Sequence, residues 1–367
     1  MGSSQAGSVC SVCSVSLVYG YHGLERHEVS EAGAGDIIAI TGIEATNLSD
    51  TLCDPEHVEP MPALSVDEPT VSMTFQVNAS PFAGRSGKYL TSRQLKDRLE
   101  RELIHNVALR AEDGTDPEKI KVSGRGELHL SVLIENMRRE GFELAVSRPE
   151  VIFRAVDGEV SEPYEAVAID IEEQHQGSLM EAMGERKGEL KHMVPDGKGR
   201  VRLDYIVPSR GLIGFQTEFM TTTSGTGLMY HVFDRYGPAQ HGGIAPRKNG
   251  AMTSNGQGKL LGFALFNLQE RGRMFASPGD EVYEGQLVDI HSRDNDPVVN
   301  PPKGKQLTNI RASVKDDAIA LVPPIKMTLE QALEFIENDE LVEVTPSEIR
   351  LREKFLQEFE RKLLQRG

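Results

Sequence analysis

The side chains considered first are those that could bind a nucleotide. A phosphate-binding loop follows the pattern G-x-x-x-x-G-K-[ST], in which backbone N–H groups surround the phosphates and a hydroxyl holds magnesium. This pattern does not occur in the sequence. The richest glycine string, Ser123 to His129, could open a helix that binds an anion. Because Glu127 places a negative charge where the phosphate would lie, we interpret the string as a tight turn that lets a helix and a strand pack closely.

Histidine, serine and cysteine patterns typical of catalytic or metal centres do not occur either. None of the ten histidines forms H-E-x-x-H, and His175, His231 and His241 could converge only through folding that the sequence does not specify. No G-x-S-x-G nucleophile motif is found. Cys10 and Cys13 form a single C-x-x-C without the second pair that tetrahedral zinc needs. The residues therefore predict no catalytic residue, no metal site and no cofactor within this chain.

One segment has the composition of an RNA contact. The run from Asn300 to Lys315 contains no Asp or Glu, although the chain has a formal net charge of -16. Pro301 and Pro302 stiffen its approach, and Gly304 permits a close turn. Cationic and amide side chains can donate to phosphate, ribose or base edges. The candidate RNA contacts are Lys303, Lys305, Gln306, Asn309, Arg311 and Lys315. The alternative is a solvated connector between two strands.

Two weaker RNA candidates accompany this run. Arg247 and Lys248 lie in a basic turn, and Arg210 stands at the expected start of a helix. A helix N-terminus favours phosphate through its free N–H groups and its dipole. Both segments could equally be structural turns.

Composition limits the kinds of partner and compartment. A pI of about 5.2 argues against indiscriminate nucleic-acid binding, since such binding is mostly phosphate neutralisation, so an RNA contact must be local. Screening over about 8 to 10 Å makes a local contact possible. No apolar run approaches the roughly 20 residues of a membrane span, and three cysteines cannot form a disulfide framework. We expect a cytoplasmic monomer without a membrane contact.

The order of expected elements predicts an α+β fold with several domains. Residues 1–16 are interpreted as a disordered or vector-derived tail, and residues 17–66 as a partial β-barrel remnant, too short to close. Residues 67–150 and 151–245 each follow the order β-α-β-β-α-β, which predicts two tandem ferredoxin-like domains. In the first, strands are expected at 71–77, near 107, near 120 and at 142–146, with helices at 92–104 and 128–139. In the second, strands are expected at 167–171, 190–193, 201–207 and 228–233, with helices at 178–186 and 212–221.

Residues 246–367 are expected to form a mixed sheet with helices. Strands are predicted at 260–266, 281–290 and 318–321. Thr328 with Gln331 predicts one capping box, and Thr345 with Glu348 predicts another at the start of a helix over 347–365. Apolar residues in one i+4 line along that helix predict that it docks on an apolar surface; they are Leu351, Phe355, Phe359 and Leu363.

Several stretches resemble translation factors. Residues 31–37 resemble the end of the β-barrel second domain of translational GTPases, and residues 124–130 resemble the third domain of elongation factor G. Residues 208–215, 303–313 and 327–334 are similar to the BipA/TypA family in particular. The resemblance covers the chain from about Tyr21 to its end. It implies a barrel remnant, two domains similar to domains III and V of elongation factor G, and a C-terminal domain particular to the family.

The resemblance also implies a function. It suggests a ribosome-binding module that contacts rRNA and the A-site tRNA near the peptidyl transferase centre, with a basic loop at Lys303 to Arg311. Family members are GTPases of ribosome assembly and stress adaptation, so GTP and magnesium would be bound by a domain outside this sequence. Two other readings remain open. One is a protein-interaction adaptor that uses the C-terminal amphipathic helix, and the other is an acyl-phosphate enzyme on a ferredoxin-like fold.

Overall fold

The structure is a computed structural model that describes residues 15–43, 50–62, 68–114, 116–156, 158–243, 247, 249–302 and 320–364. The chain divides into two compact units. The first consists of Met1–Asp67 with Glu100–Val107, and the second of Glu68–Leu99 with Ala108–Gly367. Each unit is described by itself. The mixed α+β class predicted from the sequence is confirmed.

The first unit contains a small antiparallel sheet. Its strands are β1 (Leu17–His22), β2 (Glu25–Glu28) and β3 (Ile38–Thr41), in the order β2-β1-β3. Gly23 has a φ of 63°, and it forms the tight turn between β1 and β2. No closed barrel is present among the described residues of this unit.

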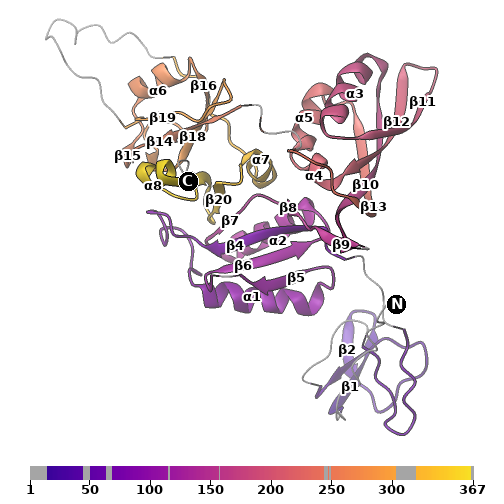
Figure 1. The fold of residues 1–367 in the computed structure, drawn as a ribbon. Coiled ribbons are helices and arrows are strands. Elements are labelled where there is room, and N and C mark those ends of the chain that lie inside the picture. Colours follow the sequence, from indigo (N-terminus) through magenta and orange to yellow (C-terminus); the bar gives the residue numbers. More distant parts are fainter. Residues whose placement is uncertain are drawn as a thin grey trace, which may run out of the picture. The chain divides into compact units, whose positions relative to one another are not determined.

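The second unit begins with the first β-α-β-β-α-β segment, which is shown in Figure 1. Its elements are β4 (Val71–Val77), α1 (Ser92–His105), β5 (Arg110–Asp113), β6 (Lys119–Gly124), α2 (Glu127–Glu140) and β7 (Leu144–Val146), although the end of α1 from Glu100 is counted with the first unit. The strands lie in the order β7-β4-β6-β5. Leu95 and Leu99 of α1 are buried at i+4 spacing, as a helix packed on a sheet requires. The strand expected near residue 107 begins three residues later, at Arg110.

The sheet of this segment is extended by strands from the far end of the sequence. β20 (Glu340–Val344) pairs with β7, and β21 (Ile349–Glu353) pairs with β20, which gives a seven-stranded sheet with β8 (Glu150–Val151) on β4. All five residues of β20 are buried. The predicted boundaries at 150 and 246 stay predictions, but one sheet unites residues from both sides of them.

The helix predicted over 347–365 is wrong. Thr345 Oγ1 accepts a hydrogen bond from the Glu348 N–H (3.0 Å), as in a capping box. However, the Thr345 N–H also donates to the Glu348 carbonyl (2.9 Å), which closes a hairpin turn between β20 and β21. Leu351 therefore points into the sheet core. Among the described residues of the predicted helix, 347–364, only α8 (Glu358–Leu364) is helical, and Phe359 and Leu363 on it are exposed.

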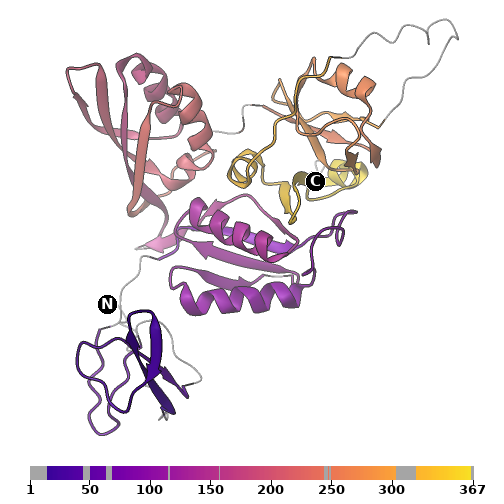
Figure 2. The same cartoon turned by 180° about the vertical axis from the view of Figure 1, so that it is seen from behind.

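The second β-α-β-β-α-β segment forms a separate five-stranded sheet. Its elements are β9 (Arg154–Val156), β10 (Glu159–Glu172), η1 (Glu173–His175), α3 (Gln176–Glu185), β11 (Glu189–Pro195), β12 (Arg200–Pro208), α4 (Ser209–Leu212), α5 (Phe215–Thr222) and β13 (Leu228–Pro238). The strands lie in the order β11-β12-β10-β13, with β9 on β10. Alternate residues of β10 and β12 form one core with α3 and α5, and both helices lie on one face of the sheet (Figures 1 and 2).

The helix predicted over 212–221 is interrupted. Gly214 has a φ of 72°, so it ends one helical turn and starts the next between α4 and α5. A Cβ at Gly211 would lie 2.6 Å from the Arg186 carbonyl oxygen. The glycines of this segment are therefore required by close backbone approach and a left-handed turn.

Most of the remaining elements form a third core. They are β14 (Ala251–Ser254), β15 (Gly258–Lys259), α6 (Gly262–Leu268), β16 (Gly272–Met274), β17 (Glu281–Val282), β18 (Leu287–His291) and β19 (Val298–Val299). Helix α7 (Leu329–Phe335) contacts α2 and β21 instead. The capping box of Thr328 and Gln331 at α7 is confirmed. The predicted strand over 281–290 is two strands, because Gly285 turns the chain at a φ of 86°.

Two further strand predictions for this region differ from the structure. Residues 262–268 form helix α6 rather than a strand, and Leu265 is the residue of α6 that is buried in the core. Leu261, Leu265 and Leu268 have the i, i+4, i+7 spacing of one helix face, which short apolar runs share with strands. Of the strand predicted at 318–321, residues 318 and 319 lie outside the described residues, and Ala320 and Leu321 are not in a strand.

Asp289 on β18 is an unusual member of this core. It is fully buried, and no described group meets its carboxylate oxygens in hydrogen-bond geometry. Burial raises the pKa of Asp289 to about 7, although the nearby Arg273 amide acts in the opposite direction. The folded protein therefore holds a proton that the unfolded chain releases near pH 4.

We expect this carboxyl group to make the free energy of unfolding fall as pH rises from about 4 to about 7, and then to stop contributing to the slope. Asp289→Asn removes the ionisation, so it should stabilise the protein at pH 8 by roughly 2 kcal/mol, less than the full pKa shift implies, because a buried amide still lacks partners. Urea denaturation at pH 5 and pH 8 measures this. An equal effect of the substitution at both pH values would contradict it.

Candidate RNA interface

Most of the predicted RNA contacts cannot be placed in the structure. Lys248, Lys303, Lys305, Gln306, Asn309, Arg311 and Lys315 lie outside the described residues. Their assignment stays a prediction. Arg210 and Arg247 are described, and both guanidinium groups are engaged in ion pairs within the chain.

Arg210 is tied to the end of the second sheet. Its Nε donates to Glu162 Oε2 (2.6 Å), and the Glu162 side chain is fully buried. Its Nη1 donates to the Gly242 carbonyl (3.0 Å), and Glu162 Oε1 also accepts the Gln240 N–H (2.7 Å). This geometry fixes residues 240–242 against β10. The structural-turn reading therefore accounts for Arg210, and its contact with RNA stays a prediction.

Arg247 joins several parts of the C-terminal region. Its Nη1 donates to both oxygens of Glu340 on β20, at 2.8 and 3.0 Å, and its Nη2 donates to Asp296 (2.9 Å). The guanidinium carbon also lies 4.7 Å from the centre of the Phe335 ring. Burial raises the pKa of Glu340 to about 7, although Arg247 opposes this shift. Without Arg247, the buried carboxylate of Glu340 would lose this cation, which is strongly destabilising. Arg247 therefore has a structural role.

We expect Arg247→Lys to destabilise the protein by about 1 to 2 kcal/mol, because an ammonium group cannot hold Glu340 and Asp296 together. The substitution keeps the positive charge, so a role in phosphate binding would survive it. Arg139→Lys is the matched control, since Arg139 is 75% exposed and pairs with Glu135 one helical turn away. Urea denaturation distinguishes the two variants. Equal stability of both would argue against a structural role for Arg247.

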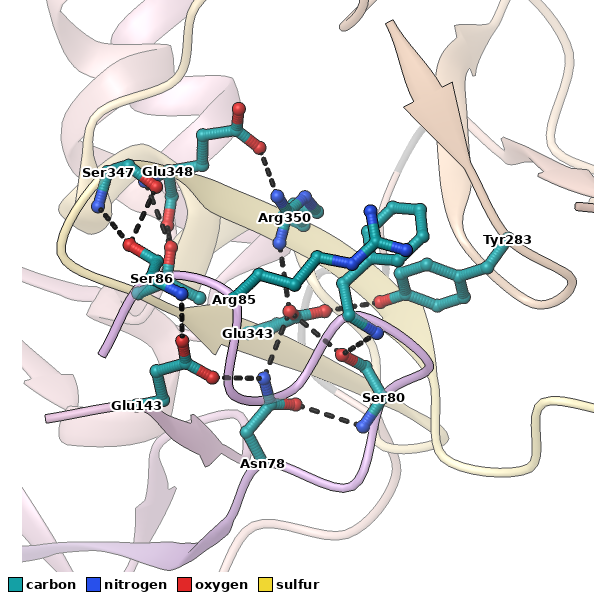
Figure 3. A network of polar contacts seen from close by, with 12 residues as sticks. Asn78, Ser80, Arg85, Ser86, Glu143, Tyr283, Glu343, Ser347, Glu348 and Arg350 are labelled. Carbon is teal, nitrogen blue, oxygen red and sulfur yellow. Dashed lines mark hydrogen bonds and ion pairs between the residues drawn. The ribbon is translucent and has the colours of Figure 1, made fainter. Parts of the chain in front are cut away.

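A buried polar network lies behind the C-terminal hairpin and is drawn in Figure 3. Glu343 on β20 is fully buried, and its Oε1 accepts from Asn78 Nδ2 (3.0 Å), Ser80 Oγ (2.9 Å) and Arg350 Nη1 (3.0 Å). The Tyr283 hydroxyl donates to its other oxygen. Burial, followed by the Glu343 charge, raises the pKa of Tyr283 well above its usual range. Glu343 thus joins the loop after β4, the loop after β17 and β21.

A second carboxylate completes the network from the other side. Glu143 accepts backbone N–H groups of Gly84 (2.8 Å), Ser86 (2.9 Å) and Gly87 (2.6 Å). Burial tends to raise the pKa of Glu143, but these three donors outweigh it, so the pKa lies below its usual value. A Cβ at Gly87 would lie 2.4 Å from Glu143 Cγ, so only glycine fits there. Two buried glutamates therefore hold the loop from Asn78 to Lys88.

A groove with a volume of 1130 Å³ runs beside this network. Its cations are Arg85, Arg138, Arg139, Lys326 and Arg350. Each of the four arginines is paired with a carboxylate, from Glu281, Glu135 and the pair Glu343 and Glu348. The groove therefore carries little excess positive charge, and it does not favour phosphate.

The buried polar network was not predicted from the sequence. The one sequence signal for this network was a pair of glutamates inside the apolar run at 340–344.

The glycine string at 123–129 has the role of a tight turn. A Cβ at Gly124 would lie 3.0 Å from both His129 Nδ1 and Leu130 Cδ2, so the strand and the helix approach closely here. Burial raises the pKa of Glu127, the first residue of α2, to about 8, with Glu334 adding to the shift. Nδ1 of His231 lies 2.5 Å from Oε2 of Glu165. Throughout the described part of the chain, no three His, Cys, Asp or Glu side chains are grouped to hold a metal ion. Nor is any helix there long and apolar enough to cross a membrane.

Comparison with known proteins gives matches along nearly the whole chain. Residues 249–358 match the TypA/BipA C-terminal domain, and residues 159–242 match the elongation factor G C-terminus. The chain is 64% identical over 353 residues to a protein named large ribosomal subunit assembly factor BipA in Salmonella typhimurium, and equally to that of Escherichia coli K12. The Haemophilus influenzae protein of the same name is 63% identical over 348 residues. These matches cover 96, 96 and 95% of this chain but 58, 58 and 56% of the relatives. The chain thus spans somewhat more than half the length of the relatives it matches.

Proposed function

Because this chain belongs to the BipA/TypA family, we propose that it is a ribosome-binding module of a translational GTPase that acts in assembly of the large ribosomal subunit. The observation that carries the proposal is the joint match to the TypA/BipA C-terminal domain and the elongation factor G C-terminus. The relatives' printed name supports the ribosome as the partner. The same proposal includes a role in stress adaptation, a cytoplasmic location and a monomeric state.

The proposed mechanism separates docking from chemistry. Both β-α-β-β-α-β segments have the strand order 4-1-3-2 when their strands are numbered along the chain, which supports the ferredoxin-like assignment. The two segments dock on the ribosome by shape complementarity, which is the role that their resemblance to domains III and V of elongation factor G implies. GTP hydrolysis, with GTP and magnesium, is assigned to a further domain of the full-length protein, and no cofactor is assigned to this chain.

The RNA contact is assigned to the acid-free basic run. Lys303, Lys305, Gln306, Asn309, Arg311 and Lys315 are proposed to touch rRNA and the A-site tRNA near the peptidyl transferase centre. The surrounding structure supports this choice over Arg210 and Arg247, since those two side chains are occupied by carboxylates. An acidic chain of net charge -16 concentrates its phosphate contacts in such a run.

Cosedimentation with 70S ribosomes and with separated subunits, at low and moderate salt, tests the proposal. Binding to the 70S ribosome and the large subunit that weakens with salt is the expected result. Absence of binding at every salt concentration would contradict a module that docks by itself.

A protein-interaction adaptor is the second candidate, because Phe359 and Leu363 on α8 are 66 and 73% exposed. Only these two residues of the predicted apolar line lie on the helix, which leaves a short stripe. Phe359→Ser should leave ribosome binding unchanged if docking uses the RNA contacts. Loss of ribosome binding in that variant would favour the adaptor.

A further inference from the structure

Two exposed arginines lie at one short strand of the third core. β16 is an end strand of the sheet β16-β18-β14-β19, and it is labelled in Figure 1. Arg271 directly precedes β16, and its carbonyl accepts the Ser292 N–H (2.9 Å), while Arg273 lies within the strand. Met274 is buried in the core. Because side chains alternate along a strand, Gly272 shares the face of Met274, and Arg271 and Arg273 lie on the opposite, exposed face.

The backbone beneath this pair is fixed from both sides. Arg273 pairs with Ile290 on β18, and the Met274 carbonyl accepts the Ile325 N–H (2.8 Å). A Cβ at Gly272 would lie 2.1 Å from the Ile290 carbonyl oxygen, so β16 and β18 approach each other more closely than any other residue would permit. The core therefore sets the positions from which the two guanidinium groups extend.

The pair has no anionic partner in the described part of the chain. No described carboxylate forms an ion pair with Arg271 or Arg273. The acidic residues that follow or precede these elements most closely in the sequence are Glu270 and Asp294. By contrast, Arg202 is 61% exposed and still pairs with Asp204 at 3.0 Å. In a chain of net charge -16, two exposed cations without such a partner are available to an external anion.

The spacing of the pair suits a phosphate backbone. Residues i and i+2 of a strand lie about 7 Å apart, which is close to the distance between successive phosphates along a nucleic-acid strand. A guanidinium group is planar and permanently charged, and it donates two parallel hydrogen bonds to one phosphate. Arg271 and Arg273 can therefore bind two neighbouring phosphates of one strand. The carboxylates of an acidic protein surface have no such fixed repeat.

We propose that Arg271 and Arg273 form a phosphate-binding site on the third core, and that this site contacts the rRNA backbone. The inference rests on the proposed function for its partner. It adds an RNA contact outside the basic run at 303–315. Phosphate contacts fix the orientation of a protein on RNA without reading the base sequence, so the site orients the core on the ribosome.

The test compares ribosome binding of the whole chain with that of a variant carrying Arg271→Gln and Arg273→Gln. Two lost phosphate contacts should lower the slope of log affinity against log salt by about 1.4 to 1.8 and weaken binding about 25- to 60-fold at roughly 0.1 M salt. Cosedimentation with 70S ribosomes between about 50 and 200 mM salt measures both quantities. Thermal unfolding confirms that the variant is folded.

The matched control carries Arg202→Gln and Arg235→Gln. It removes the same charge from two arginines that are 61 and 58% exposed and paired with Asp204 and Asp234. Its salt slope should stay near that of the unsubstituted chain, and equal losses in the two variants would overturn the inference. A weaker affinity of the Arg271→Gln, Arg273→Gln variant with an unchanged slope would indicate an acidic protein partner and would also overturn it.

A charge-retaining variant separates the roles of charge and geometry. Arg271→Lys with Arg273→Lys keeps both positive charges but loses the paired hydrogen bonds of each guanidinium group. We expect an unchanged salt slope and an affinity between those of the unsubstituted chain and the glutamine variant. A lysine variant as weak as the glutamine variant, with the same reduced slope, would contradict a phosphate contact.

Filter binding of poly(U) at low salt separates this inference from the proposed function, because it requires no ribosome. Weaker poly(U) binding by the glutamine variant, but not by the Arg202 and Arg235 control, is the expected result. That result would support the phosphate site even if the unsubstituted chain failed to bind ribosomes, which would contradict the proposed function alone. If the glutamine variant binds poly(U) as well as the unsubstituted chain does, the pair is not a phosphate site.

Discussion

Glu343→Ala is expected to destabilise the second unit by about 3 to 5 kcal/mol. The substitution removes the one acceptor shared by Tyr283, Asn78, Ser80 and Arg350. Tyr283, Asn78 and Ser80 are buried, so each loses a hydrogen bond away from water, although Asn78 keeps Glu143 and the Ser80 hydroxyl still accepts the Phe82 N–H. The Arg350 guanidinium would lose its buried counter-charge. Urea denaturation measures the total loss. Amide hydrogen exchange along β20 and β21 shows whether the hairpin is the part that opens.

Glu348→Ala is the matched control for this prediction. Glu348 pairs with the same Arg350 side chain, but it is 58% exposed, and exposed pairs contribute about 0 to 1 kcal/mol. Tyr283→Phe removes a single donor and should lie between the two variants. If Glu343→Ala and Glu348→Ala lose the same stability, the buried network does not hold the hairpin to the sheet. Retained exchange protection in β20 would lead to the same conclusion.

The triple substitution Lys303→Ala, Lys305→Ala, Arg311→Ala is expected to weaken ribosome binding about 100-fold or more at roughly 0.1 M salt. Each lost phosphate contact lowers the slope of log affinity against log salt by about 0.7 to 0.9, and at this salt concentration it lowers log affinity by the same amount. Three contacts therefore change both by roughly 2 to 2.7. Cosedimentation or a filter-binding titration between about 50 and 200 mM salt measures the two quantities together.

A second triple variant controls for the change in net charge. Lys96, Lys119 and Lys362 are exposed, and each pairs with a carboxylate, from Asp113, Asp116 and Glu358. Replacing all three with alanine should leave the salt slope nearly unchanged, because charges beyond a Debye length are largely screened. Equal losses in both triple variants would show a general electrostatic effect and would remove the special role of residues 303–311.

Elements with a strong local signal were predictable. The strand at 71–77 has the predicted bounds, and α1 and α2 lie within a residue of the predicted helices, because alternation and i+4 spacing are properties of neighbouring residues. The capping box at Thr328 is equally local. Family membership also followed from short stretches of sequence, as the matched regions confirm.

Where one local pattern serves two structures, the prediction failed. Thr345, Pro346 and Glu348 suit a helix start, but the same Thr-x-x-Glu spacing closes the β20–β21 turn. Pairing with β7 selects the strand over the helix, because residues 342–344 pair with the edge of β7, which lies far away in the sequence. The run at 260–266 was misjudged for a similar reason, because a short apolar stretch fits either a buried strand or a buried helix.

The sequence by itself determined the α+β class, the repeated β-α-β-β-α-β order, the family and the basic run at 303–315 as the candidate RNA contact. Only the tertiary structure decided that Arg210 and Arg247 are held by Glu162 and Glu340, that Glu343 unites three distant segments, and that no described carboxylate pairs with Arg271 or Arg273. The physical reason is the range of the interactions. Periodicity and capping act over a few residues, whereas a buried carboxylate or amide is satisfied by whichever partner the fold brings to it, at a sequence distance that no local pattern records.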